Sequence, residues 1–374
     1  MNSTTATTEE VTMTTHAFGR RAALGLAGGA ALAAGIGPAS AQERRLVAVM
    51  PGPFLPNGAR AILERQINAR IENLPYVSPT DTAAKLMAPG GTSRYDLMYS
   101  TTGFIQAPVL RERAGQELAR PLDLSKIPNA AKISPLFQSE ITKRGDNTFM
   151  LPVVWGYDSV VYDRDRIPEN DPLTQSWGLL FDDKYAGRVA LRDDPYQSIC
   201  LTALHLGIRS PETMSQADLN RVTQFLISKK RNFRTIWGSF AEAVNLMSSR
   251  EVDAIFGWIP MRAALQAQGR NVTNNWPREG LLVFTHSAFI PRESRNVELA
   301  HAAINGALSD EFGKQLGEET QYPVTNANVA ASFSAEDQAR LGYDVEKRGI
   351  PLHRYAFPAA MDRWIEAWGR FKAA

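Results

Sequence analysis

Hydrophobic and polar positions along the chain form short apolar runs separated by loops and amphipathic stretches. Runs that predict buried strands occur at 46–50, 95–99, 151–156, 159–162, 187–191, 252–258 and 287–291. Helical patterns follow at 59–69 and 197–206. This alternation predicts α/β architecture with mostly parallel strands. Because ligands of such sheets gather at loops after the carboxyl ends of strands, the loops at 51–57 and 100–103 are candidate ligand walls.

The C-terminal segment 359–372 has a helical apolar stripe. Trp364, Trp368 and Phe371 stand at positions i, i+4 and i+7. This spacing places the three rings on one helix face. The alternative is an aromatic ligand box, but we favour a helix that packs its stripe on the body of the protein.

The first 41 residues have the pattern of a secretory signal. The pair Arg20-Arg21 precedes an uncharged run, 22–36, which is rich in Ala, Gly and Leu, and the small residues 38–41 follow. We expect cleavage after Ala41. The paired arginines favour the twin-arginine route, with an ordinary Sec signal as the alternative. No later run is long and apolar enough to span a bilayer, so we expect a protein free in the periplasm.

Composition adds few constraints. The 374 residues are 21% charged with a formal net charge of +2, which is ordinary globular composition without a pull toward nucleic acid or acidic membranes. This length suggests two domains or two lobes. The chain has one cysteine, Cys200, so it forms no intramolecular disulfide, and we expect this thiol to lie in the core.

Common catalytic signatures are absent from the sequence. It has no G-x-S-x-G, no H-E-x-x-H and no phosphate-binding loop that ends in Gly-Lys-Ser/Thr. No two of the five histidines have a helical spacing suited to a metal. The carboxylate pairs 182–183 and 193–194 are more typical of turns or helix caps than of acid–base catalysis. We therefore expect no cofactor, no metal and no enzyme, although catalytic groups can also lie far apart in sequence.

Seven segments, taken in order, resemble periplasmic spermidine/putrescine-binding proteins. They are Arg94–Thr101 (RYDLMYST), Leu151–Gly156 (LPVVWG), 176–189 (SWGLLFDDKYAGRV), 191–194 (LRDD), 276–280 (WPREG), 287–291 (SAFIP) and 321–326 (QYPVTN). Each match alone is weak, but their common order over nearly the whole mature chain is specific.

The resemblance implies a two-lobed periplasmic binding protein fold, type II-like, in which crossover strands near 153–156 and 284–288 form the hinge. Lobe 1 would comprise 43–153 and 284–326, and lobe 2 would comprise 154–283 and 327–374. The lobes of such a protein close on a ligand in the cleft between them. The resemblance also implies a monomer that partners the membrane permease of an ABC transporter and binds no nucleic acid.

Family members are expected to hold polyamines with aromatic walls and carboxylates. Carried over by position, Ser100 and Thr101 match a polar loop of lobe 1. Asp194 matches a cleft carboxylate, Trp258 an aromatic wall and Tyr322 a cleft tyrosine.

Three positions depart from the family pattern. Phe54 replaces a tyrosine, Gln197 replaces a carboxylate and His286 replaces an aspartate. Losing two carboxylates should weaken selection for a multiply charged amine, since a buried ammonium needs its counter-charge. A neutral histidine suits an anion or an amide better. The segment 234–237 is expected to be a loop facing the cleft. Within this segment, Trp237 is a candidate aromatic wall of the cleft. Arg234 is expected to bind either a ligand carboxylate or a surface partner.

The sequence thus predicts a substrate-binding protein of an ABC importer that captures a polyamine or related small polar organic solute. A second hypothesis is a twin-arginine-exported periplasmic enzyme on an α/β scaffold. A third is the same fold adapted to a metal or an anion. The absent cofactor motifs count against the second hypothesis, and the absence of adjacent cleft tyrosines counts against a metal.

Overall fold

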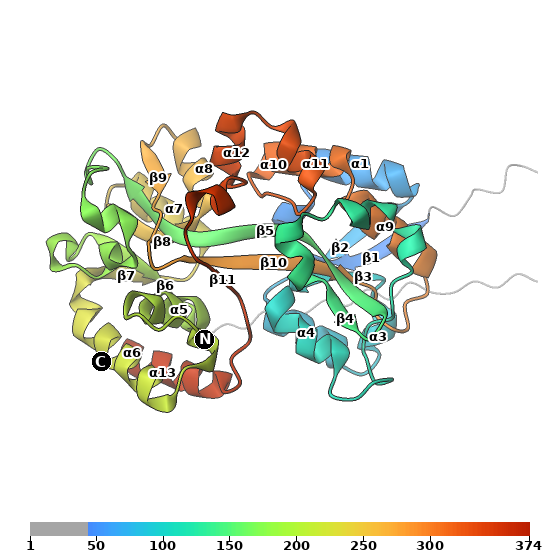
Figure 1. The fold of residues 1–374 in the computed structure, drawn as a ribbon, viewed down its shortest axis with the longest axis horizontal. Helices are drawn as coiled ribbons and strands as arrows, with labels where there is room; N and C mark the ends of the chain where they lie inside the picture. The colour runs from blue at the N-terminus through green and yellow to red at the C-terminus, as the bar shows by residue number, and fades with distance from the viewer. Residues whose placement is uncertain (1–43) are drawn as a thin grey trace, which may run out of the picture. The chain divides into compact units, whose positions relative to one another are not determined.

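The computed structural model describes residues 44–374, and the predicted signal segment 1–41 lies outside them. Residues from Glu43 to Ala374 form one compact unit (Figure 1). Its strands are β1 (Arg45–Val49), β2 (Arg70–Leu74), β3 (Leu97–Thr101), β4 (Thr142–Arg144), β5 (Asn147–Asp163), β6 (Val189–Arg192), β7 (Phe233–Trp237), β8 (Ala254–Trp258), β9 (Val272–Asn274), β10 (Leu281–Phe289) and β11 (Leu352–Arg354).

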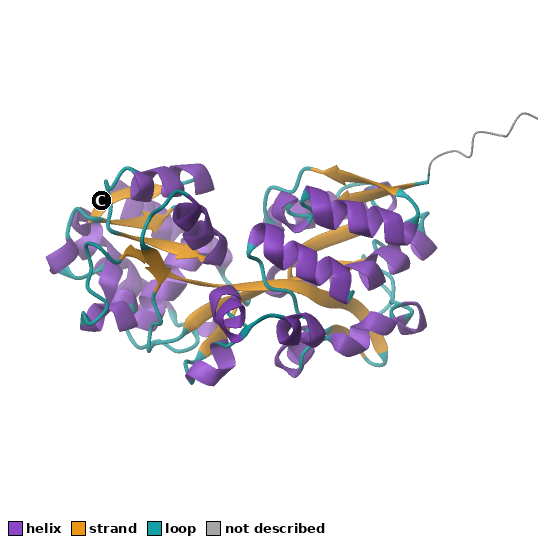
Figure 2. Ribbon diagram, turned by 90° about the horizontal axis from the view of Figure 1, so that it is seen from above, coloured by secondary structure: helices purple, strands orange, loops and turns teal. Residues whose placement is uncertain are grey.

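Helices cover the strands on both sides (Figure 2). The α-helices are α1 (Asn57–Ile67), α2 (Pro79–Met87), α3 (Gly91–Arg94), α4 (Thr102–Leu110), α5 (Pro195–His205), α6 (Gln216–Lys229), α7 (Phe240–Ser248), α8 (Ile259–Ala267), α9 (Val297–Ala307), α10 (Asp310–Thr320), α11 (Ala327–Ser332), α12 (Ala335–Leu341) and α13 (Met361–Ala373). The short 3₁₀ helices are η1 (Gly52–Phe54), η2 (Leu124–Lys126), η3 (Pro128–Lys132), η4 (Pro135–Glu140), η5 (Pro172–Gln175), η6 (Trp177–Leu180), η7 (Asp183–Tyr185), η8 (Pro211–Thr213), η9 (Lys230–Asn232) and η10 (Val345–Arg348).

The strands pair in the order β2-β1-β3-β10-β5-β8-β6-β7. The outer strands pair in parallel on each side, β1 with β2 and β3, and β6 with β7 and β8. The central strands β5 and β10 are antiparallel to each other and to their other neighbours on this path, β8 and β3. The prediction of mostly parallel strands was therefore wrong for the centre of the sheet, because two long strands cross there from one lobe to the other (Figure 1).

Each lobe has its own hydrophobic core. One core contains side chains of β1, α1, α9 and α10, and the other contains side chains of β6, β8, α5 and α13. The predicted C-terminal helix is confirmed as α13, which buries Trp364, Trp368 and Phe371 in the second core. Beyond position 326, Val329 and Val345 lie in the first core.

Three local predictions need correction. The runs 151–156 and 159–162 belong to one strand, β5, because its backbone pairs continuously with β10 and then with β8. The loop expected at 100–103 is instead the end of β3 and the start of α4. The loop expected at 234–237 is part of strand β7, which pairs with β6. Arg234 is exposed there and forms an ion pair with Glu251, with Nη2 3.4 Å from Oε2.

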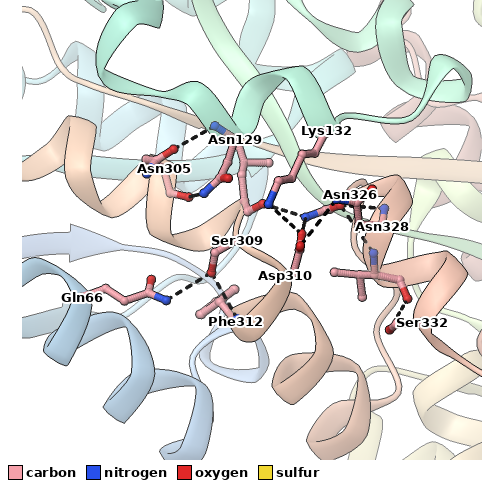
Figure 3. Close-up of polar contacts among 12 residues, drawn as sticks. Gln66, Asn129, Lys132, Asn305, Ser309, Asp310, Phe312, Asn326, Asn328 and Ser332 are labelled. Carbon is pink, nitrogen blue, oxygen red and sulfur yellow. Dashed lines mark hydrogen bonds and ion pairs between the residues drawn. The ribbon is translucent and has the colours of Figure 1, made fainter.

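A polar cluster anchors the segment that follows α10 (Figure 3). The side-chain amide of Asn326 donates to Asp310 Oδ1 at 2.7 Å and to the Leu308 carbonyl at 2.8 Å. Lys132 lies 3.0 Å from the same Asp310 oxygen. The backbone of this segment also bridges to β5, where Val324 pairs with Val154. These contacts hold the preceding turn, with Tyr322, against the crossing strands.

Candidate functional site

A cavity of about 470 Å³ lies where the ends of β3, β6 and β8 approach the crossing strands β5 and β10. Its walls are strongly aromatic, and its polar groups come from different elements. Principal lining residues are Phe54, Tyr76, Thr101, Phe104, Asp158, Arg192, Asp194, Tyr196, Gln197, Trp258, Phe284, His286, Tyr322 and Tyr355. The position agrees with the rule that ligands of α/β sheets collect beyond the carboxyl ends of strands.

Seven of the nine residues predicted from the sequence line this cavity: Phe54, Thr101, Asp194, Gln197, Trp258, His286 and Tyr322. The other two lie behind its walls. Ser100 is fully buried in β3, opposite Ser287 of β10. Trp237 is only 1% exposed, and its ring packs against that of Trp258 with centroids 6.0 Å apart. The structure therefore gives Trp237 a supporting place behind the wall.

One wall is a cluster of three rings. Phe54 contacts His286 and Tyr322 edge-on, with ring centroids 4.8 Å and 5.1 Å apart. Burial lowers the pKa of His286 to about 3, so its imidazole is neutral at physiological pH. Its Nε2 lies 3.4 Å from the Thr101 hydroxyl, while its Nδ1 has no partner among residues 44–374.

Asp158 is the most deeply buried carboxyl group of the site, and it was not predicted from the sequence. Its Oδ2 accepts hydrogen bonds from the Tyr355 hydroxyl and from Gln197 Nε2, the latter at 3.1 Å. Its Oδ1 has no partner within the described chain. Burial raises the pKa of the Asp158 carboxyl to about 7. The signal in the sequence was a carboxylate inside an apolar strand, where burial is costly without partners.

Asp194 has two roles in the structure. Its Oδ1 accepts the backbone N–H of Gln197 at 2.8 Å and so caps the N-terminus of α5, while the residue also lines the cavity. Its neighbour Asp193 accepts from Trp368 Nε1 at 2.7 Å and pairs with Lys372. The expectation of a helix cap is thus confirmed for Asp194, whereas Asp193 binds α13 instead.

Arg192 also lines the cavity and was missed in the sequence. Its guanidinium carbon lies 5.2 Å from the ring centre of Trp258 and 5.5 Å from that of Trp237. Among residues 44–374 its guanidinium forms no ion pair and no hydrogen bond. The Trp258 ring is fixed in turn by a hydrogen bond from Nε1 to the Tyr322 hydroxyl at 3.1 Å. The stacked guanidinium is thus a preoriented donor that faces the cavity.

The described residues contain neither a cluster of metal ligands nor a helix that could span a membrane. Within the described part of the chain, no three His, Cys, Asp or Glu side chains gather as a metal site would require. From residue 44 onward, the helices are too short or too polar for any one of them to cross a bilayer.

A family model for bacterial extracellular solute-binding proteins matches residues 94–344. The chain belongs to this family. The match covers most of the chain and includes nearly all the cavity residues carried by β3, β5, α5, β8 and β10. The resemblance inferred from the ordered sequence motifs is confirmed.

Individual proteins that are similar to this chain give the same picture. The chain is 24% identical to the putrescine-binding periplasmic protein PotF of Escherichia coli (strain K12) over 324 residues, which cover 82% of this chain and 84% of that protein. A putative spermidine/putrescine ABC transporter structure from Listeria monocytogenes matches with a TM-score of 0.74 at 20% identity, covering 88% and 99% of the two chains. The binding protein AgtB of A. tumefaciens R10, in complex with agropinic acid, matches with a TM-score of 0.68 at 16% identity and the same coverage.

These neighbours share the fold of the solute-binding family and establish the two-lobed architecture. The site itself can hold a small molecule through aromatic faces and a few buried polar atoms. That combination is typical of solute sites, where apolar walls supply contact area and polar groups fix orientation.

Proposed function

We propose that the protein captures a small polar organic solute in this cavity and delivers it to the membrane permease of an ABC importer, without chemical turnover. The observation that carries the proposal is a set of buried polar atoms of cavity residues that have no hydrogen-bond partner among residues 44–374. They are Asp158 Oδ1, Gln197 Oε1 and His286 Nδ1. Buried polar groups are normally hydrogen-bonded, so three such atoms in one cavity indicate that a ligand completes them.

A polyamine or a related polar solute fits the aromatic walls. PotF is named for putrescine, and AgtB was solved with agropinic acid, so structures of this fold accept ligands of different charge. Gln197 and His286 support a ligand with less positive charge than a polyamine, since neither offers a counter-charge.

We further propose that the protein works in the periplasm as a monomer after removal of residues 1–41. Its lobes would close over the cavity by bending of β5 and β10. In this division, 43–153 and 284–326 form one lobe, and 154–283 with α13 form the other. We place residues 327–345 in the first lobe, although the sequence predicted lobe 2 for them, and the packing of Val329 and Val345 in the first core supports this change.

A thermal-shift screen tests the proposed function. The purified mature chain is heated with polyamines, amino acids, opine-like compounds and small carboxylates. One class should raise the melting temperature, because a ligand at 100 times its Kd stabilises the folded state by about 2.7 kcal/mol. If no solute raises the melting temperature while a chromogenic substrate is consumed, the receptor function is wrong and the enzyme alternative stands.

Trp258→Ala provides a site-directed version of the same test. The indole is half-buried, lines the cavity and supports Arg192, so its loss should weaken the best ligand at least about tenfold. Calorimetric titration of both proteins measures the change. Equal affinities would remove Trp258 from the binding site.

A further inference from the structure

The proposed function leaves the charge of the solute open, and the arrangement of charges in the cavity addresses it. Resting on that function, we propose that the solute is zwitterionic, with an anionic oxygen group bound by Arg192 and an amine N–H bound by Asp158. The solute class is therefore an amino or imino acid rather than a polyamine.

Arg192 provides the binding site for the anionic group of the solute. Its guanidinium lies against the indoles of Trp258 and Trp237 and forms no ion pair with any residue between 44 and 374. Asp194 also lines the cavity, yet one of its oxygens is engaged by the backbone at the start of α5. A planar guanidinium held by two aromatic faces is matched in geometry by a carboxylate, which it can bind through two parallel hydrogen bonds.

Asp158 provides the binding site for the amine of the solute. Its Oδ2 already accepts two hydrogen bonds, from Tyr355 and Gln197, whereas its Oδ1 accepts none from the part of the chain that the structure describes. The free oxygen belongs to a residue only 1% exposed that lines the cavity. A carboxylate oxygen in that position is satisfied by an N–H donor from the ligand, most strongly by an ammonium.

The guanidinium of Arg192, which has no ion-pair partner among residues 44–374, separates a zwitterion from a diamine. Two carboxylates, Asp158 and Asp194, face the cavity together with one guanidinium, and the buried His286 is neutral. A diamine could pair its two ammonium groups with Asp158 and Asp194, but it would leave the Arg192 guanidinium without a counter-charge beside like charges, which repel. A ligand with one group of each sign gives both Asp158 and Arg192 an opposite charge.

The test compares three four-carbon probes whose charges differ while their lengths match: 1,4-diaminobutane, 4-aminobutanoate and butanedioate. Larger amino and imino acids, including opine-like compounds, are added to fill the cavity. Thermal shift ranks the compounds, and calorimetric titration of the full mature chain gives the affinities. Compounds that carry both an amine and a carboxylate should bind best.

Variants of Arg192 then test whether its guanidinium binds the anionic group of the ligand. Arg192→Gln should weaken the best ligand at least about tenfold, and Arg192→Lys should recover part of the loss, because lysine keeps the charge but not the two-pronged geometry. Arg234→Gln is the matched control, since Arg234 is exposed and pairs with Glu251. It should leave the affinity unchanged. If Arg192→Gln proves unstable, Arg192→Lys alone decides, with a loss of several-fold expected.

Two results would overturn the inference while leaving the receptor function intact. One is a best ligand that lacks a carboxylate, such as 1,4-diaminobutane. The other is an unchanged affinity when Arg192 is replaced. A third result, in which no compound of any charge binds, would contradict the proposed function itself and this inference with it.

Discussion

Asp158 and His286 are two buried titratable groups in one cavity, and burial shifts their pKa values in opposite directions. The pKa of Asp158 rises to about 7 and that of His286 falls to about 3, because desolvation disfavours the charged form of each group. Arg192 offsets part of the rise for Asp158, and Asp194 adds to it. The side chains of Asp158 and His286 are therefore both neutral at mildly acidic pH.

The opposite shifts predict opposite contributions to stability. Asp158 has a folded pKa above its unfolded value of about 3.9, so its contribution is complete below that value and is lost as pH rises through about 7. His286 has a folded pKa below its unfolded value of about 6.5, so its contribution is complete above that value and is lost as pH falls toward about 3. Between about pH 4 and 6.5 the two slopes nearly cancel.

Asp158→Asn removes one of the two opposing contributions, so the pH dependence of stability that comes from His286 should become visible. Relative to the wild type, the variant should gain free energy of unfolding as pH rises from about 4 to 7, by at most about 1.4 kcal/mol per pH unit. His286→Gln should gain relative stability as pH falls below about 6.5. Urea denaturation at a series of pH values measures both, with Arg234→Gln as a control. Variant curves that run parallel to the wild type would contradict the shifts.

The residue scale also shows what the sequence could and could not predict. Phe54, Trp258 and Tyr322 were found because they occupy positions of a motif near the end of an element. Asp158 and Arg192 were missed because none of the site positions carried over from the family falls on them and because side-chain direction depends on tertiary structure. Asp158 points into the cavity only because β5 crosses between the lobes at that residue.

At the scale of elements, β5 and β10 form the floor of the cavity, and Gly156 permits their close packing. Gly156 of β5 pairs with Phe284 of β10, and a Cβ at Gly156 would lie 2.5 Å from the tip of the Phe284 ring. Phe284 itself lines the cavity. Gly156 therefore determines where the Phe284 ring lies in the cavity wall, although Gly156 itself does not line the cavity.

Gly156→Ala should turn the Phe284 ring and so change the shape of the cavity. We expect a loss of about 1–3 kcal/mol in stability, typical of overpacking, and a several-fold weaker affinity for the best ligand. Gly369→Ala in α13 is the matched control, because apart from the neighbouring residues and the backbone of its own helix nothing lies within 4 Å of a Cβ placed there. Denaturation and calorimetric titration of both variants measure the two effects. Unchanged affinity in Gly156→Ala would mean that the ring moves away from the ligand.

Elements were predicted well where their signal is local. The stripe of α13 and the strand β1 follow directly from periodicity. The continuity of β5 was not predicted, because Gly156 and Asp158 interrupt its apolar pattern and only pairing with β10 and β8 keeps it extended. Strand β7 was taken for a loop for a related reason, since its pairing with β6 is a tertiary interaction.

At the scale of the whole molecule, the fold requires no disulfide bond. Cys200 is buried in α5, where burial raises the pKa of its thiol well above the ordinary value, so the thiol is an inert part of the core. Folding therefore requires no oxidising compartment. This agrees with the proposed twin-arginine route, which carries folded proteins.

Replacing both arginines of the pair, Arg20→Lys and Arg21→Lys, should block that route. The precursor should stay in the cytoplasm at full length, because the route depends on the paired guanidinium groups and lysine keeps only their charge. The pair Arg44→Lys and Arg45→Lys is a matched control at the start of the mature chain, and its product should reach the periplasm. Cell fractionation with immunodetection separates these outcomes. If the first variant still reaches the periplasm in processed form, the signal works through the Sec route, and the protein then folds after export rather than before it.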